Sequence, residues 1–251
     1  MSGRLGAAVE RISAGMTTRD IVPGHPWADT APVRAELFSA ERLEQHAISL
    51  ASAQPVAERT KRVRTLRRRL DDNAKVLLTA WRASASEVAA GREVVPAATW
   101  LLDNYHLVEA QIREVRTDLP EGYYRLLPKL ADGPFAGYPR VFGVTWAFVA
   151  HTDSHFDPDI LRRYLVAYQT VQPLTIGELW AVAITMRIVL IENLRRLADQ
   201  MTMGRADRLD ANSLADRICA PGQAHTALLP EVARLAGRPL SEVFAAQLAK
   251  R

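Results

Sequence analysis

The feature that most constrains the fold is a set of three apolar blocks between Trp100 and Met201, joined by two short linkers rich in Pro, Gly and Asp. Apolar residues in each block recur every three or four positions, which is the period of a helix with one buried face. The alternation typical of strands is scarce. Amphipathic helices separated by breakers bury their apolar faces against each other. The sequence therefore predicts an all-α fold, a multi-helix bundle.

The same pattern continues on both sides of these blocks and predicts about six main helices. They are expected at about residues 39–54, 56–89, 97–117, 139–151, 157–171 and 175–201. Residues 119–138 carry several Pro and Gly residues, so an irregular linker is expected there.

Local capping signals support these helix starts. Ser39 and Asp157 are suited to the N-cap position, and Pro158 is suited to the first turn that follows Asp157. Thr175 and Glu178 have the spacing of a capping box, in which each residue bonds the amide of the other. These residues are predicted to have structural roles at helix ends.

Three domains are expected: a flexible segment over 1–35, a helical core over 36–201, and a short-helix extension over 202–251. The extension is expected to form helices at about 206–219, 228–236 and 240–249, and a short N-terminal helix is expected at about 4–13. The last helix has an apolar face without an evident cover. We therefore expect the native polypeptide to continue into a missing downstream module.

Composition fits a soluble protein. Hydrophobic residues make up 48% of the chain and charged residues 24%, and no apolar run reaches the ~18 residues of a membrane span. A net charge of +4 permits an anionic partner without requiring one. Cys219 is the single cysteine, so no disulfide can form within the chain.

The most ligand-like string is His151-Thr-Asp153-Ser-His155-Phe-Asp157, with imidazole or carboxylate groups at alternate positions. Such groups bind zinc and other divalent metals, so His151, Asp153 and His155 form a candidate metal site. The alternative is a polar loop whose residues serve turns and the Asp157 cap. Asp157 and Asp159 also spell the Asp-x-Asp pair of many glycosyltransferases, but their position at a helix start favours capping.

Glycosidase chemistry needs two carboxylates roughly 5–10 Å apart. Glu178 and Glu192 lie on one predicted helix, where fourteen residues separate them by about 21 Å. They cannot form such a pair. Glu178 is predicted to be a cap, and Glu192 a buried or interhelix ion partner of an arginine.

Seven cationic side chains lie within eleven residues: Arg59, Lys61, Arg62, Arg64, Arg67, Arg68 and Arg69. Of these, Arg62, Arg67, Arg68 and Arg69 are candidates for contact with an anionic surface. The favoured interpretation is a solvated helix face whose partners include Asp71 and Asp72. No recognition motif accompanies the charge, so nucleic acid is not expected.

Four aromatic residues near helix ends and linkers, Tyr123, Tyr124, Tyr138 and Trp146, are candidates for stacking on a sugar. Aromatic residues in such positions more often anchor a core, with a hydrogen-bonded polar tip. The core role is therefore favoured.

Between about Trp27 and Ala198 the chain resembles the N-terminal region of cyclic β-1,2-glucan synthases, which are large bacterial membrane enzymes. The resemblance lies in the strings PWADTAPVRAELFSAERLEQHA, WLLDNYHLVEAQIREVR, GYYRLLPKLADGP, GYPRVFGVTWAFVAHTDS and QPLTIGELWAVAITMRIVLIENLRRLA.

This resemblance implies a parent enzyme that uses UDP-glucose and a divalent metal on the cytoplasmic side of the inner membrane. It implies downstream glucosyltransferase and membrane modules as partners, with β-1,2-glucan or the membrane surface as further contacts. The family's catalytic motifs are absent here, so a non-catalytic helical module without its own cofactor is expected. A metal-dependent hydrolase or transferase using the His151–Asp157 string, or a glucan-binding module, are the alternatives.

Overall fold

The computed structural model describes Trp27 and residues 30–57, 63–218 and 241–251. Within these residues the regular structure is helical, apart from two isolated β-bridges, Val56 with Leu130 and Lys129 with Pro139. The prediction of an all-α fold is therefore confirmed. The chain divides into two compact units, Met1–Leu197 and Ala198–Arg251, and each is described by itself.

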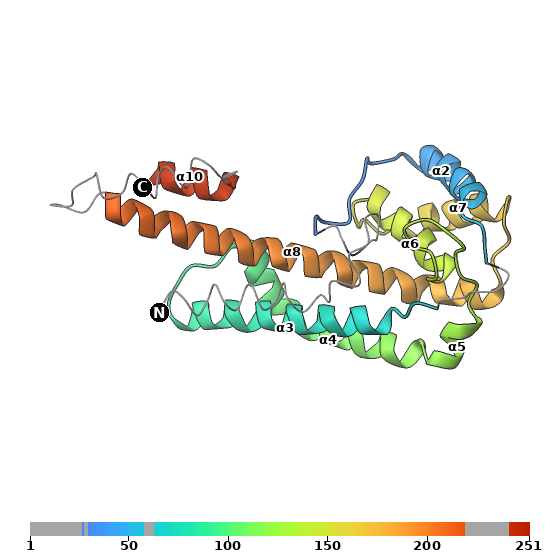
Figure 1. The fold of residues 1–251 in the computed structure, drawn as a ribbon, viewed down its shortest axis with the longest axis horizontal. Helices are drawn as coiled ribbons and strands as arrows, with labels where there is room; N and C mark the ends of the chain where they lie inside the picture. The colour runs from blue at the N-terminus through green and yellow to red at the C-terminus, as the bar shows by residue number, and fades with distance from the viewer. Residues whose placement is uncertain (1–26, 28–29, 58–62, 219–240) are drawn as a thin grey trace. The chain divides into compact units, whose positions relative to one another are not determined.

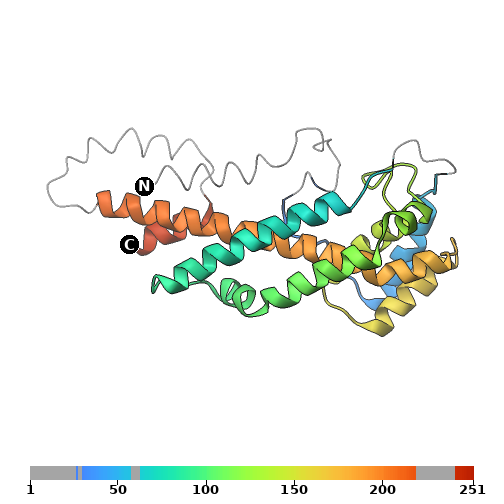
Figure 2. The ribbon, with the colours of Figure 1, turned by 90° about the horizontal axis from the view of Figure 1, so that it is seen from below.

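The first unit contains most of the helices (Figure 1). They are α2 (Ala40–Ala53), α3 (Arg67–Ala89), α4 (Pro96–Asp118), α5 (Glu121–Leu126), α6 (Arg140–His151), α7 (Pro158–Gln169) and the first half of α8 (Ile176–Ile218). Helices α3 and α4 form a hairpin, which Figure 2 shows from a second side. Gly91 adopts a φ of +69° in the turn between them, a conformation that glycine tolerates without strain. Helix α2 packs against α7 and α6.

The second unit contains the remainder of α8 and α10 (Glu242–Lys250). Ala211 and Leu214 of α8 form a small buried cluster with Phe244 of α10. Ser241 accepts a hydrogen bond from the amide of Phe244, as an N-cap does. This contact explains why the last predicted helix forms.

Four predicted helices agree with α2, α4, α6 and α7 to within a few residues, but the prediction for 56–89 is wrong in its first part. Residues 56, 57 and 63–66 are not helical. The amide of Ala57 donates to the carbonyl of Lys129, and the amide of Arg64 donates to that of Gly137. These bonds to the distant 128–139 segment replace the hydrogen bonds that a helix would provide.

Two other boundaries also differ. The predicted linker 119–138 contains α5, which begins after Pro120 and buries Tyr124. Helix α8 does not end near Met201 but continues to Ile218, so the short helix expected at 206–219 is part of it. The helices expected at 4–13 and 228–236 lie outside the described residues.

The core of the first unit is built around α6 and α8. Their fully buried side chains include Val141, Phe142, Val144, Phe148, Ala181, Ile188 and Val189. Burial of the valine, isoleucine and phenylalanine side chains contributes roughly 1.5–3 kcal/mol each relative to exposure. None of the helices in the described part of the chain is both long and apolar enough to span a lipid bilayer.

The predicted caps are confirmed. Ser39 Oγ accepts from the amide of Arg42, and Asp157 Oδ1 accepts from the amides of Asp159 and Ile160. Glu178 accepts from the amide of Thr175, whose hydroxyl accepts from the amide of Glu178. Each cap satisfies helix amides that have no partner within the helix.

Replacing Asp157 by Ala is expected to lower the free energy of unfolding by about 1 kcal/mol, because two first-turn amides of α7 lose their acceptor. Urea denaturation followed by circular dichroism measures the change. Asp159→Ala is the matched control, since this exposed carboxylate lies in the same turn and caps no amide in α7. Equal losses for the two variants would contradict the capping role.

Candidate functional site

The three residues predicted to bind a metal do not converge on one point in the structure. The ring of His151 stacks on Phe38 with centroids 3.9 Å apart, and its Nδ1 lies 2.7 Å from the carbonyl oxygen of Glu36. Both carboxylate oxygens of Asp153 accept from Arg34, at 2.7 and 2.8 Å. His155 is exposed on the loop before α7.

Across the described ranges, no group of three or more His, Cys, Asp or Glu side chains is arranged to hold a metal ion. Asp153 and Ser154 instead adopt positive φ angles in the reversal between α6 and α7. Ser154 Oγ accepts from Asn193 Nδ2, and Asn193 Oδ1 accepts from the amide of Val33. The string therefore connects α6, α8 and the segment before α2.

The predicted ion pair of Glu192 is confirmed, and it forms a fully buried hub. Its carboxylate accepts two bonds from Arg69, at 2.7 and 2.8 Å, one from Asn73 and one from Arg196. Burial alone raises the pKa of Glu192, but hydrogen bonds and charge from Arg69, and then from Arg196, outweigh it and lower this pKa to about 2. The carboxylate is thus ionised throughout the physiological range.

Glu178 forms a second buried ion pair. Its two oxygens accept from Nε and Nη2 of Arg140, at 2.8 and 2.6 Å, in addition to the capping bonds. The same guanidinium donates to the side chain of Gln172 and the carbonyl of Pro173. Arg140 thereby ties the start of α6 to the linker before α8.

The four candidate sugar-stacking residues do not form one platform. Tyr138 and Trp146 belong to an aromatic cluster with Trp27 and Phe142, in which neighbouring rings lie 5.8–5.9 Å apart. Tyr138 is buried, and its hydroxyl accepts from the indole of Trp27. Tyr138 therefore packs in the core, and the partly buried Trp146 packs against Trp27 and Phe142 at its edge.

Tyr123 and Tyr124 are adjacent on α5 and bond different elements. The hydroxyl of Tyr123 donates to the carbonyl of Gly177 at the start of α8. Tyr124 is buried, and its hydroxyl donates to the carbonyl of Arg64 in the segment before α3. The ring of Tyr124 forms part of the wall of a cavity.

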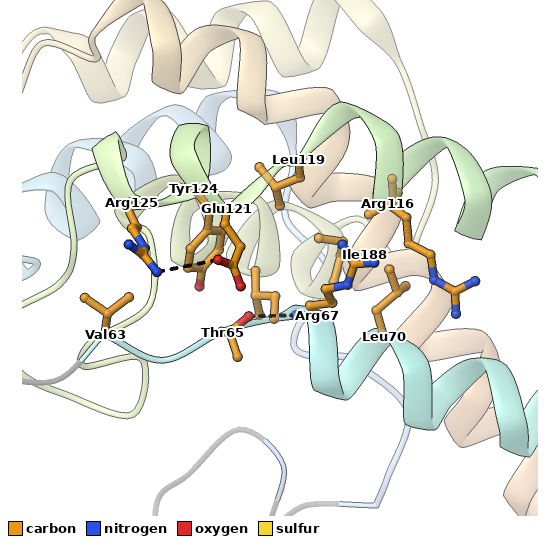
Figure 3. Close-up of a pocket in the computed structure, with 12 residues that line it drawn as sticks. Val63, Thr65, Arg67, Leu70, Arg116, Leu119, Glu121, Tyr124, Arg125 and Ile188 are labelled. Carbon is orange, nitrogen blue, oxygen red and sulfur yellow. Dashed lines mark hydrogen bonds and ion pairs between the residues drawn. The ribbon is translucent and has the colours of Figure 1, made fainter.

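This cavity, of about 220 Å³, lies where α3, α4, α5 and α8 meet, and it is the candidate functional site (Figure 3). Its apolar wall is formed by Val63, Leu66, Leu70, Val115, Leu119, Tyr124 and Ile188. Thr65 and Glu121 add polar atoms. Three arginines, Arg67, Arg116 and Arg125, also line it.

The three cavity arginines differ in their partners. Arg116 donates to Asp71 of α3 through Nε and Nη2, at 3.0 and 2.7 Å. Arg125 lies 3.5 Å from Glu121 in an exposed pair. The guanidinium of Arg67 has no hydrogen-bond or ion-pair partner in the described part of the chain, although its backbone amide bonds Thr65 Oγ1. The cavity therefore carries positive charge.

The predicted basic surface is only partly present. Arg67 and Arg68 are exposed at the start of α3, whereas Arg62 lies outside the described residues. Arg69 is only 9% exposed because it pairs with Glu192, so its prediction as a surface contact is wrong. Asp71 pairs with Arg116 and Asp72 with Lys75.

Lys129 is a further buried cation beside this region. Its ammonium donates to the carbonyls of Tyr124 and Leu127 and lies 4.8 Å from the centre of the Tyr124 ring. Burial lowers its pKa to about 8, and the charge of Glu178 opposes this change. The ammonium holds the end of α5 in place.

Sequence reasoning missed Arg116, Arg125 and Lys129. They are scattered along the chain and form no local motif, so no spacing signal could have singled them out. Arg116 is only visible as a site residue once α4 is folded back on α3.

Comparison with known proteins supports the resemblance given by the sequence strings. No protein-family model matches the chain. Cyclic beta-(1,2)-glucan synthase NdvB of Rhizobium meliloti (strain 1021) is 38% identical to the chain over 206 residues. The match takes in 80% of this chain but only 7% of the relative. The predicted similarity to a region of such a synthase is thereby confirmed.

Proposed function

We propose that this chain, similar to a small region of a cyclic β-1,2-glucan synthase, is a non-catalytic helical module that supports β-1,2-glucan synthesis. It would do so by docking onto other regions of a larger glucosyltransferase. The observation that carries this proposal is an exposed apolar patch at the start of α8. The buried carboxylates of the same unit are held in ion pairs.

The ion pairs favour a structural role for the buried acids. A general acid or base must exchange a proton near the working pH. Glu192 has a pKa of about 2 and is held by two arginines, while Glu178 is held by Arg140 and Thr175. Neither carboxylate faces the cavity, whose lining contains Glu121 as its one acid among the described residues.

The apolar patch consists of Ile176, Leu179 and Trp180 of α8 with Tyr123 and Leu126 of α5. Ile176, Trp180 and Leu126 are 75%, 76% and 84% exposed, and Leu179 is 40% exposed. The bond from Tyr123 to Gly177 joins the two helices at this point. Exposed apolar residues grouped in this way mark interaction surfaces, and tryptophan is enriched at their energetic centres.

The expected occupant of the patch is another region of the same synthase. Most of the length of the relative lies outside the stretch that this chain matches. Under this proposal the other regions would bind UDP-glucose and a divalent metal at the cytoplasmic side of the membrane. This chain would help to position those regions and would supply no catalytic side chains.

A region exchange tests this function. The 206-residue match in the relative would be deleted, or replaced by the corresponding residues of this chain, in cells lacking their own synthase. We expect the deletion to abolish cyclic glucan, measured by mass spectrometry of cell extracts, and the exchange to restore it. The isolated chain should show no turnover of UDP-glucose. Glucosyl transfer by the isolated chain would contradict a non-catalytic role.

Within the exchanged protein, Trp180→Ala combined with Ile176→Ser is expected to lower the glucan yield at least about fivefold, because the centre of the patch is lost. Trp100→Ala is the matched control, since Trp100 is a half-exposed tryptophan on α4 outside the patch. Immunoblots would establish equal protein levels. An unchanged yield in the double variant would reject the patch as the docking surface.

A further inference from the structure

We propose that the cavity between α3, α4, α5 and α8 binds a phosphate group, carried by a small phosphoester or by a lipid headgroup. This site is separate from the apolar patch and does not depend on the proposed docking function. The cavity, its charge and the apolar part of its wall each contribute to the inference.

The size of the cavity restricts its ligand to a small group. A volume of about 220 Å³ lies below the range of roughly 300–1,000 Å³ that is typical of sites for drug-sized molecules. A phosphate with a glycerol-sized substituent fits this space, whereas a chain of several sugars does not. Figure 3 shows that its lining residues come from both the segment before α3 and the loop between α4 and α5.

The charge of the cavity favours an anion. Arg67, Arg116 and Arg125 line it; Arg116 pairs with Asp71 and Arg125 with Glu121, which leaves the positive charge of Arg67 in excess. Planar guanidinium groups bind phosphate oxygens through paired hydrogen bonds, and several of them can share one phosphate. Arg67 has no anionic partner among the described residues, so it is available to a ligand.

The start of α3 adds to this positive potential. Its first turn contains Arg67, Arg68 and Arg69 and no acidic residue, and its N-cap Leu66 provides no side-chain bond. Cations near the positive end of a helix dipole are unfavourable unless a negative charge compensates them. Arg69 is compensated by Glu192, whereas Arg67 faces the cavity. A bound phosphate would supply the missing negative charge.

The apolar wall indicates an ester rather than free phosphate. Leu70, Leu119 and Ile188 face the cavity together with the ring of Tyr124. The Tyr124 hydroxyl already donates its hydrogen bond to the carbonyl of Arg64, so the ring presents mainly its apolar surface to the cavity. The organic part of a phosphoester could therefore lie against this wall while its phosphate meets the arginines.

Isothermal titration calorimetry of the whole chain at low salt tests the site with four probes: inorganic phosphate, glycerol 3-phosphate, glycerol, and vesicles of phosphatidylcholine with or without phosphatidylglycerol. We expect glycerol 3-phosphate to bind more tightly than inorganic phosphate, and glycerol not to bind. Binding that is confined to the phosphatidylglycerol vesicles would identify a lipid as the source of the phosphate.

Two variants separate a built site from general surface charge. Arg67→Gln is expected to raise the Kd for the bound probe at least about tenfold, because a charge-assisted bond is lost. Val63→Trp places bulk at the cavity wall without altering charge and is expected to cause a similar loss. Arg113→Gln is the matched control, because Arg113 is an exposed α4 arginine that pairs with Glu109 outside the cavity. Its Kd should stay within about twofold, because Arg113 lies outside the cavity and forms no charge-assisted bond with a phosphate bound there.

Circular dichroism would establish that each variant is folded. Absence of binding by every phosphate probe at about 10 mM would overturn the proposal. It would also be overturned if Arg67→Gln and Arg113→Gln weakened binding equally, or if Val63→Trp had no effect. In either case the phosphate would be held by surface charge and not in the cavity.

Discussion

Glu192→Gln is expected to lower the free energy of unfolding by about 3–5 kcal/mol, the usual range for breaking a buried ion pair. The neutral amide would remove the negative charge that the buried Arg69 and Arg196 share, and it has one acceptor oxygen where the carboxylate has two for Arg69, Asn73 and Arg196. These groups lie on two helices, α3 and α8, so the loss should also weaken the packing between them. Urea denaturation followed by tryptophan fluorescence measures the change.

The control for this variant is Glu109→Gln. Glu109 forms an i,i+4 pair with Arg113 in which both side chains are more than half exposed. Such pairs contribute roughly 0.3–0.5 kcal/mol. If the two variants lost the same stability, the Glu192 hub would not hold the helices together.

The low pKa of Glu192 also predicts how stability depends on pH. A carboxylate with a lowered pKa in the folded state stabilises the protein above its unfolded pKa, and the contribution is lost as pH falls through the folded value. The pKa of Glu192 changes from 4.5 to about 2, so its contribution should disappear between about pH 5 and pH 2. The slope of stability against pH in this window should be smaller in Glu192→Gln.

Arg140→Met is the second variant with a large expected effect, a loss of about 3–5 kcal/mol. Methionine occupies much of the volume of arginine but leaves Glu178 as a buried carboxylate without a cation. The bonds to Gln172 and Pro173 are lost as well. Amide hydrogen exchange should therefore become faster at 172–178 than elsewhere in the unit, in addition to the loss measured in urea.

Two further variants make this result specific. Arg140→Lys keeps the charge but cannot form the paired bonds to Glu178, so an intermediate loss is expected. Arg162→Met is the control, because Arg162 is exposed and its contact with Asp159 is 3.9 Å. If Arg140→Met were no more damaging than Arg162→Met, the ion pair would not fix the linker between α7 and α8.

The helices of the first unit could largely be predicted because their signals are local. The N-cap of Asp157, followed by Pro158, and the capping box of Thr175 and Glu178 depend on residues within one helical turn. The prediction failed at 56, 57 and 63–66, where the amides of Ala57 and Arg64 donate to a segment about seventy residues away. The pattern of apolar residues along the chain gives no signal for a hydrogen bond between such distant segments.

The candidate site was much less predictable. The sequence predicted that Glu192 would pair with an arginine. It did not predict that this arginine is Arg69, which lies 123 residues away and was expected on the basic surface. It also gave no indication that Arg116 and Arg125 would share a cavity with Arg67.

The sequence by itself determined the helical character of this protein, the ends of most helices and which residues are suited to burial. Those properties follow from the 3.6-residue period and from hydrogen bonds at helix ends, which involve near neighbours. Only the tertiary structure decided which arginine meets which carboxylate and where the helices leave a cavity. A helix period identifies the buried face but not the helix that packs against it, so contacts between distant segments arise only when the chain is folded.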